Sequence, residues 1–192
     1  YIKTIHHGID IKQFDFQSRC DDTLLFFGRI HKDKGARQAI EIARACNKKL
    51  ILAGIIQDQA YYNQHVAPHI DNDKMIYTGS VGPVERNRLL GKACALLHPI
   101  QFDEPFGLSV IESMACGTPV IAFDRGSMPE LIENGKSGFL VNTVDEAIAT
   151  VARIKEIDRA ACRRHVERHF TVDRMINEYI KVYEMILDSE RL

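Results

Sequence analysis

Residues 93–123 read ACALLHPIQFDEPFGLSVIESMACGTPVIAF, and this pattern is enough to indicate the fold class. The segment opens and closes on short apolar runs, 93–98 and 119–123, which lack polar alternation and are typical of strands buried on both faces of a sheet. Between them, an apolar helical run begins at Leu108 and ends before Gly117. A strand, a helix and a second strand in this order predict a right-handed crossover between parallel strands.

The same alternation continues on both sides of this segment. Short apolar runs predict strands, and the amphipathic stretches between them predict helices. The expected strands are residues 23–27, 49–53, 75–78, 93–98, 119–123 and 138–141, and the expected helices are 36–47, 60–70, 84–92, 108–115 and 128–132. We therefore expect an α/β fold with a Rossmann-like, doubly wound parallel sheet of six strands. Ligands of such sheets bind outside the carboxyl ends of the strands.

After Val141 the pattern is helical to the end of the chain. Thr143 or Asp145 can cap a first helix, Asp158 opens a second, and residues 172–187 are expected to form the last one. The last helix carries a wide apolar stripe. We expect this stripe to pack on its own domain, with docking on a partner domain as the alternative.

Composition restricts the classes of function. The 192 residues carry 25 Lys and Arg against 26 Asp and Glu, so no global field favours nucleic acid or an anionic membrane. The five cysteines are widely spread without a CxxC pair, which is typical of a reducing, cytosolic environment without a disulfide framework or a zinc site. The sequence has no membrane-length apolar run and no signal-like start. Because it begins with Tyr1 rather than Met, we expect a piece of a longer protein.

Two glutamates flank the start of the helix expected at 108–115. Pro105 and Gly107 place Glu104 on a loop, and Glu112 lies one turn into the helix. The backbone N–H groups that open the helix, aided by the helix dipole, can bind a phosphate. Amides for a phosphate between two carboxylates suit a ligand with an anionic middle and hydroxyl-bearing ends, as in a nucleotide sugar.

Loops after two other expected strands offer complementary groups. Residues 28–35 read GRIHKDKG, whose Arg29 and Lys34 can hold phosphate oxygens, although charged loops are more often solvated turns. Residues 79–83 read GSVGP, and the glycines permit the close backbone approach that suits edge contacts with a nucleobase. Neither loop matches the Walker pattern or the GxGxxG fingerprint.

The segment EPFGLSVIESMACGTPVIAFDRGSMPELIENGKSGFLV, residues 104–141, resembles the C-terminal, donor-binding half of retaining GT-B glycosyltransferases of family 4, the group with a Glu-x7-Glu motif. HHGID followed by Phe14, and GRIHKDKG, are similar to the entry segment and the phosphate loop of that family. The resemblance implies that residues 1–192 form the nucleotide-sugar donor domain. About 1–142 would be the α/β sheet region and about 143–192 the C-terminal helices, with an N-terminal acceptor domain outside this chain.

The roles of the family's residues carry over to the matching positions. The resemblance implies that Arg29 and Lys34 hold the donor diphosphate and stabilise the leaving group. It implies that Glu104 faces the transferred sugar as an orienting group more than as a nucleophile, and that Glu112 hydrogen-bonds the ribose. The other implied donor contacts are Gly28, Phe106, Gly107 and Leu108 for the sugar and phosphates, and Gly79, Ser80 and Val81 for the base.

The implied function is transfer of a hexose from a UDP- or GDP-activated donor, such as UDP-glucose or GDP-mannose, with retention of anomeric configuration. No cofactor and no metal is expected, because side-chain cations replace the metal in such enzymes. The implied partners are the donor, an acceptor that is a lipid, a glycan or a small molecule, and the N-terminal domain, but no nucleic acid. The expected location is cytoplasmic, which is compatible with peripheral membrane association of the full-length enzyme. We expect this domain alone to bind the nucleotide and to transfer little or no sugar.

Alternatives to this function remain open. One is a non-catalytic module that binds a nucleotide sugar, and another is a GT-B-type nucleotide-sugar epimerase. A phosphorylase would need a lysine for pyridoxal phosphate, for which there is no convincing candidate, and a dehydrogenase is disfavoured by the missing GxGxxG. Residues 125–127 depart from the family's paired glycines, which leaves sugar specificity open. For His98 a structural role is favoured over a catalytic one, and for Glu130 a capping or ion-pairing role.

Overall fold

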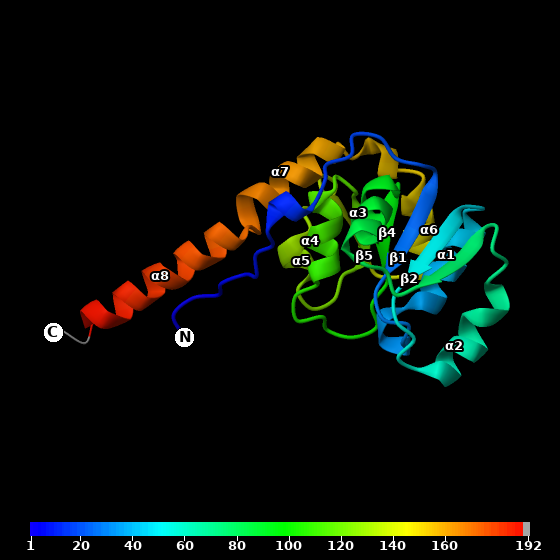
Figure 1. Cartoon of the computed structure of the whole chain (residues 1–192), viewed down its shortest axis with the longest axis horizontal. Helices are drawn as coiled ribbons and strands as arrows, with labels where there is room; N and C mark the ends of the chain where they lie inside the picture. Colours follow the sequence, from blue (N-terminus) through cyan, green and yellow to red (C-terminus); the bar gives the residue numbers. More distant parts are fainter. Residues whose placement is uncertain (190–192) are drawn as a thin grey trace.

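The computed structural model describes residues 1–189 and contains one six-stranded parallel sheet between layers of helices (Figure 1). The strands are β1 (Thr23–Phe27), β2 (Lys49–Ala53), β3 (Met75–Gly79), β4 (Ala95–His98), β5 (Val120–Phe123) and β6 (Gly138–Val141). Their order is β3-β2-β1-β4-β5-β6, and each neighbouring pair is parallel. The expected α/β, Rossmann-like fold with a helical C-terminus is confirmed.

The helices are α1 (Ala36–Ala45), α2 (Gln59–His65), α3 (Pro83–Lys92), α4 (Leu108–Ala115), α5 (Met128–Leu131), α6 (Val144–Val151), α7 (Arg159–His169) and α8 (Val172–Ser189). The helix predicted for 60–70 ends at His65, and a 3-10 turn at Ala67–His69 follows. Pro68 lies in that turn, and a proline there cannot donate the backbone hydrogen bond that would continue the helix. Among residues 1–189, every helix is too short or too polar to traverse a lipid bilayer.

The strand order places a switch point in the middle of the sheet. The chain adds β2 and β3 on one side of β1, then crosses back and adds β4, β5 and β6 on the other side. With right-handed crossovers, this reversal puts α1 and α6 on one face and α3, α4 and α7 on the other, in agreement with the packing of α1 on α6 and of α4 on α7. The connections leave β1 and β4 in opposite directions, which opens a crevice at their carboxyl ends.

The expected strands are continuously apolar because both faces of the sheet are covered. Every residue of β4 and β5 is buried. At the other end of the chain, the Thr143 hydroxyl accepts from the Glu146 N–H (3.1 Å) and begins α6, while the Asp158 carboxylate accepts from the Ala160 N–H (2.9 Å) and begins α7. Of the two caps considered for the first helix, Thr143 is therefore the correct one.

Helix α8 does not pack on the sheet domain. Figure 1 shows it running away from the sheet, with the N-terminal residues of the chain nearby. Within the described range, none of the α8 residues is buried, and Ile176, Tyr179, Ile180 and Tyr183 are all exposed. The expectation that the apolar stripe of the last helix packs on its own domain is therefore wrong. A sequence pattern shows that a helix has an apolar face, but it does not show what covers that face.

Candidate functional site

A cavity of about 570 Å³ opens at the carboxyl ends of β1 and β4, at the switch point of the sheet. The residues that line it come from the N-terminal segment, the end of β1, α3, the end of β4, and α4 with the loop before it. They are His7, Phe26, Phe27, Gly28, Arg29, Lys34, Arg86, His98, Glu104, Pro105, Phe106, Gly107, Leu108, Ser109 and Glu112. The structure thus brings together all of the predicted site residues except those at 79–81.

The loop after β1 supplies the two cations that were predicted to bind phosphate. Gly28 extends β1 by donating its N–H to the Ala53 carbonyl (3.0 Å), and Arg29 follows it and donates to the side-chain oxygen of Gln57. Lys34 ends a 3-10 turn and forms an ion pair with Glu104. Both cations therefore reach the cavity from a short, hydrogen-bonded loop.

The loop after β4 lies directly against the loop after β1. The Gln101 N–H donates to the Asp33 carbonyl at 2.7 Å. Gly35 has a φ of 78°, and a Cβ at this position would lie 1.9 Å from the Pro99 carbonyl oxygen, so only glycine fits. This contact sets Lys34 beside Glu104, although the two are 70 residues apart in the chain.

The turn after β5 fastens the loop that carries Glu104. The Ser127 N–H donates to the Glu104 carbonyl (3.0 Å), and the Ser127 hydroxyl donates to the Phe106 carbonyl (2.5 Å). Gly126 has a φ of 57°, and a Cβ there would lie 2.4 Å from the Glu104 nitrogen. The sequence singled out residues 125–127 only as a departure from a family pattern, whereas the structure shows that they hold the site in place.

Glu112 faces the cavity from α4 and forms an ion pair with Arg86 of α3. The Arg86 Nη1 lies 3.2 Å from the Glu112 Oε1, and the guanidinium stacks 5.1 Å from the centroid of the Phe14 ring. Burial raises the pKa of Glu112, and the positive charge of Arg86 opposes that shift. The sequence analysis missed Arg86. Its place one helical turn after Gly82, at the end of the predicted base loop, is the signal that could have found it.

Helix α4 begins at the cavity without a side-chain cap. Gly107 precedes it in the left-handed conformation, with a φ of 99°, and no side chain in the described part of the chain accepts a hydrogen bond from the first turn. Uncapped N–H groups and the helix dipole form a site for an anion. The Phe106 ring lies beside this helix start and contacts His7 edge-on at a centroid distance of 5.1 Å.

His98 ends β4 behind the pair of Lys34 and Glu104. Its Nε2 lies 4.0 Å from the Glu104 Oε2 and, among the described residues, has no hydrogen-bond partner. Burial, followed by the positive charge of Lys34, lowers the pKa of His98 to about 3. The imidazole is therefore neutral at any physiological pH.

The remaining predicted residues lie outside this cavity. Gly79 ends β3 at the edge of the sheet, where its carbonyl accepts from the Gly54 N–H at 2.8 Å. Ser80 and Val81 follow in the connection to α3. Contact of Gly79, Ser80 and Val81 with a base stays a prediction. Glu130 forms an ion pair with His6 at 2.8 Å, which confirms the expected ion-pairing role.

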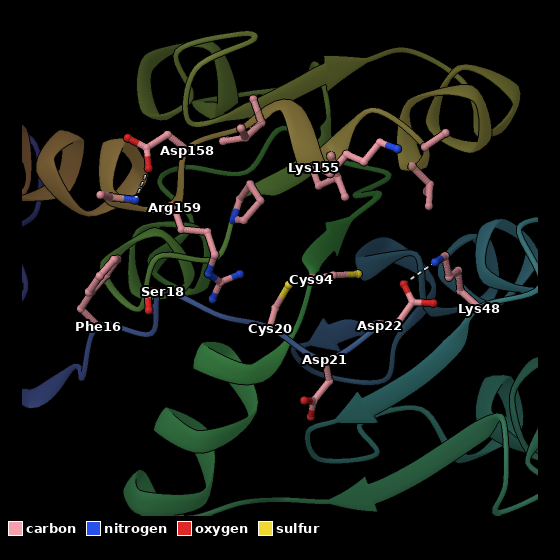
Figure 2. A pocket seen from close by; sticks show the side chains of 16 residues that line it. Phe16, Ser18, Cys20, Asp21, Asp22, Lys48, Cys94, Lys155, Asp158 and Arg159 are labelled. Carbon is pink, nitrogen blue, oxygen red and sulfur yellow. Dashed lines mark hydrogen bonds and ion pairs between the residues drawn. The ribbon is translucent and has the colours of Figure 1, made fainter.

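A larger cavity, of about 850 Å³, lies at the opposite edge of the sheet, next to the starts of β1, β2, β4 and β5 (Figure 2). Its charged groups are engaged in holding the fold together. Asp22 forms an ion pair with Lys48, shown by a dashed line in Figure 2. The Arg159 guanidinium donates at 2.6 to 3.0 Å to the carbonyls of Gln17, Gly91 and Ala93 and to the hydroxyl of Thr118. Within residues 1–189, no three or more His, Cys, Asp or Glu side chains are grouped so as to hold a metal ion.

Comparison with known protein sequences agrees with the position of the first cavity. The sequence model of the family described as glycosyl transferases group 1 matches residues 10–167. The chain is 30% identical over 173 residues to the glycogen synthase of Mycobacterium tuberculosis, which covers 85% of this chain and 42% of that protein. It is 29% identical over 167 residues to a 41.2 kDa protein in the cps region of Klebsiella pneumoniae, with coverage of 84% and 46%. The chain thus spans less than half the length of these two relatives.

Solved structures show the same fold. AviGT4, a glycosyltransferase involved in avilamycin A biosynthesis, superposes with a TM-score of 0.82 at 27% identity, covering 96% of this chain and 58% of that one. HepE from Anabaena, in complex with UDP and glucose, superposes with a TM-score of 0.82 at 20% identity, covering 95% and 56%. The similarity to HepE concerns the fold alone.

Proposed function

Because this chain belongs to the glycosyl transferases group 1 family, we propose that it is the donor-binding part of a retaining hexosyltransferase of GT-B family 4. The observation that carries the proposal is the cavity at the switch point of the sheet, where two cations, an uncapped helix start and two carboxylates converge. HepE, whose fold is similar, binds UDP and glucose, which supports a UDP-sugar as the first donor to test.

In this proposal the donor lies across the start of α4. The diphosphate accepts hydrogen bonds from the first N–H groups of the helix and from Arg29 and Lys34. The hexose extends toward Glu104, and the ribose extends toward Glu112, whose carboxylate is oriented by Arg86. The segment 79–81 leads into α3, the helix that carries Arg86, and base contacts there would be adjacent to the ribose.

The proposed chemistry follows from the charge that develops in the reaction. The bond between the anomeric carbon and the diphosphate breaks, so negative charge accumulates on the leaving group. Arg29, Lys34 and the dipole of α4 stabilise that charge, and we propose that they do so without a metal or a cofactor. Retaining hydrolases use two close carboxylates, one as the nucleophile. Here Glu112 is proposed to bind the ribose, so Glu104 acts as an orienting group at the sugar.

The acceptor and its domain belong to the rest of the proposal. We propose that an N-terminal domain outside residues 1–192 binds a lipid, glycan or small-molecule acceptor and completes the active site in the cytoplasm. Nucleic acid is not proposed as a partner, because the net charge is −1. Without the acceptor domain, the present chain is proposed to bind the nucleotide and to transfer little or no sugar.

Isothermal titration of this chain with UDP, GDP, ADP, UDP-glucose and GDP-mannose tests the proposal. We expect at least one uridine or guanosine ligand to bind with a dissociation constant below about 1 mM. Glu112→Ala should weaken that binding by about tenfold or more, because it removes the group proposed to bind the ribose. Glu133→Ala is the matched control, since Glu133 forms an exposed ion pair with Lys136 far from the cavity lining. The proposal is wrong if none of the five ligands binds at about 5 mM.

A further inference from the structure

We propose that His98 is a positioning residue, which takes over the carboxylate of Glu104 when Lys34 turns to the diphosphate of the donor. The inference rests on the proposed function, in which Lys34 stabilises the leaving group. It gives a specific role to a buried histidine, whereas the family roles carried over above assign none to it.

Lys34 cannot fully serve two anions at once. In the structure it forms an ion pair with Glu104, and the two side chains are only 15% and 13% exposed. A carboxylate so deeply placed is strongly destabilised when its counterion leaves, because water cannot replace the lost contact. If Lys34 moves to the phosphates, Glu104 therefore needs a second hydrogen-bond donor close by.

His98 is placed to be that donor. Its Nε2 lies 4.0 Å from the Glu104 Oε2, about 1 Å beyond the length of a hydrogen bond. The same nitrogen is buried and, within residues 1–189, has no hydrogen-bond partner. Buried polar atoms are nearly always paired, so an unpaired one beside a carboxylate indicates a contact made in another state of the site. A shift of the Glu104 side chain by about 1 Å would satisfy both groups.

The histidine cannot move to follow Lys34, so the carboxylate must come to the ring. His98 is the last residue of β4 and is paired with Ala122 of β5. Pro99 follows it, and the Pro99 carbonyl is in tight contact with Gly35. The side chain is 5% exposed. A ring held in this way offers its Nε2 from a constant position.

The neutral state of His98 suits this role. Lys34 and Glu104 are the charged groups that face the ring, and burial together with Lys34 keeps the pKa of His98 far below neutrality. A neutral imidazole donates one N–H without adding a positive charge. Glu104 then keeps its negative charge and can still accept hydrogen bonds from sugar hydroxyls.

Three substitutions separate a hydrogen-bonding role from a role in packing. His98→Gln places an amide nitrogen near the position of Nε2, His98→Asn places it near Nδ1, and His98→Phe keeps a ring without a donor. Titration with the tightest nucleotide found above should show that Asn and Phe weaken binding by about tenfold, whereas Gln stays within about threefold of the unsubstituted chain. Circular dichroism on each variant verifies that it is folded.

A second background shows whether the effect passes through Glu104. In Glu104→Gln there is no carboxylate to satisfy, so adding His98→Phe should change nucleotide affinity by less than about twofold. An equal tenfold loss in both backgrounds would show that His98 acts through packing, and the proposal would be wrong.

Nuclear magnetic resonance of the chain labelled with ¹⁵N-histidine provides a readout that packing alone does not move. We expect the neutral tautomer with its proton on Nε2, and a shift of that proton signal on saturation with the nucleotide because the bond to Glu104 forms. A proton on Nδ1, or an Nε2 signal that the nucleotide leaves unchanged, would contradict the role. Failure of the unsubstituted chain to bind any nucleotide would instead contradict the proposed function.

Discussion

At the scale of single residues, the charged side chains of the cavity are held in pairs. Lys34 is held by Glu104, Arg86 by Glu112, and Arg29 by the amide oxygen of Gln57. Such pairing keeps long side chains in one rotamer, which reduces the entropy lost when a ligand binds. It also means that a carboxylate competes with an incoming phosphate for Lys34.

This competition predicts an unusual effect of removing Glu104. Glu104→Gln should increase the affinity for a bare nucleoside diphosphate by about three- to tenfold, because Lys34 is released to the phosphates. Lys34→Met should weaken the same binding. Titration calorimetry with UDP or GDP measures both effects. A loss of diphosphate affinity in Glu104→Gln would show that Glu104 supports the phosphates instead of competing with them.

The residues that sequence analysis found and missed differ in how they reach the cavity. Arg29, Lys34, Glu104 and Glu112 lie in motifs that are local in the chain, and the structure brings these four together. Arg86 reaches the cavity only because α3 lies beside α4, and this relation depends on the order of the strands. A local pattern contains no information about such a neighbour.

At the scale of elements, loops and their glycines decide where the site residues lie. The Gly126–Ser127 turn holds the backbone of Glu104 and Phe106 from a separate strand end. This bracing loop is rigid because it has no space for a larger residue at Gly126.

Gly126→Ala should therefore lower the free energy of unfolding by about 2 kcal/mol or more, through an unfavourable φ and a clash with the Glu104 backbone. Gly135→Ala is the matched control. Gly135 has a φ of 79°, and a Cβ there would meet no described atom within 4 Å, so only the backbone conformation is penalised. Urea unfolding of both variants measures the difference. Equal losses would mean that the contact with Glu104 relaxes freely.

Most elements could be predicted from the sequence because buried strands and capped helices leave local signals. β1, β2, β6 and α4 begin and end at the predicted residues. The packing of α8 could not be predicted, because the same apolar stripe is compatible with a buried and with an exposed helix. The outcome depends on neighbours in space, which periodicity does not encode.

At the scale of the whole molecule, the sheet and its first seven helices form the stable body, and α8 extends from it. The core is continuous from the strands to α7, where Val166 and Cys162 are fully buried. Stability should therefore depend on α7 and hardly on the distal part of α8.

Removing the residues after Asn177 should change the melting temperature by no more than about 2 °C, because no buried contact is lost within the described residues. Val166→Ala, inside the buried face of α7, should lower the free energy of unfolding by about 1 to 3 kcal/mol. Thermal unfolding followed by circular dichroism compares the two. A large destabilisation by the truncation would show that α8 contributes to the core.

His98 should make the molecule sensitive to acid. Its pKa is lowered to about 3 in the folded chain, so below its ordinary value of 6.5 the unfolded chain binds a proton that the folded chain does not. Stability should therefore be complete above pH 6.5 and fall as the pH decreases toward 3, by up to about 1.4 kcal/mol per pH unit. Urea unfolding at pH 7 and pH 5 should show a smaller difference for His98→Gln. Glu112, whose pKa is raised, acts in the opposite direction near its own range and reduces the net effect.

The close contact between Gly35 and the Pro99 carbonyl has a consequence for exchanging parts between related proteins. The cation loop at 28–35 and the carboxylate loop at 99–107 fit each other atom by atom, yet two strands and three helices separate them in the chain. A chimera with a crossover between these loops would inherit Lys34 from one parent and its partner from the other. Recombination that preserves a working donor pocket should therefore transplant both loops from the same parent, or neither.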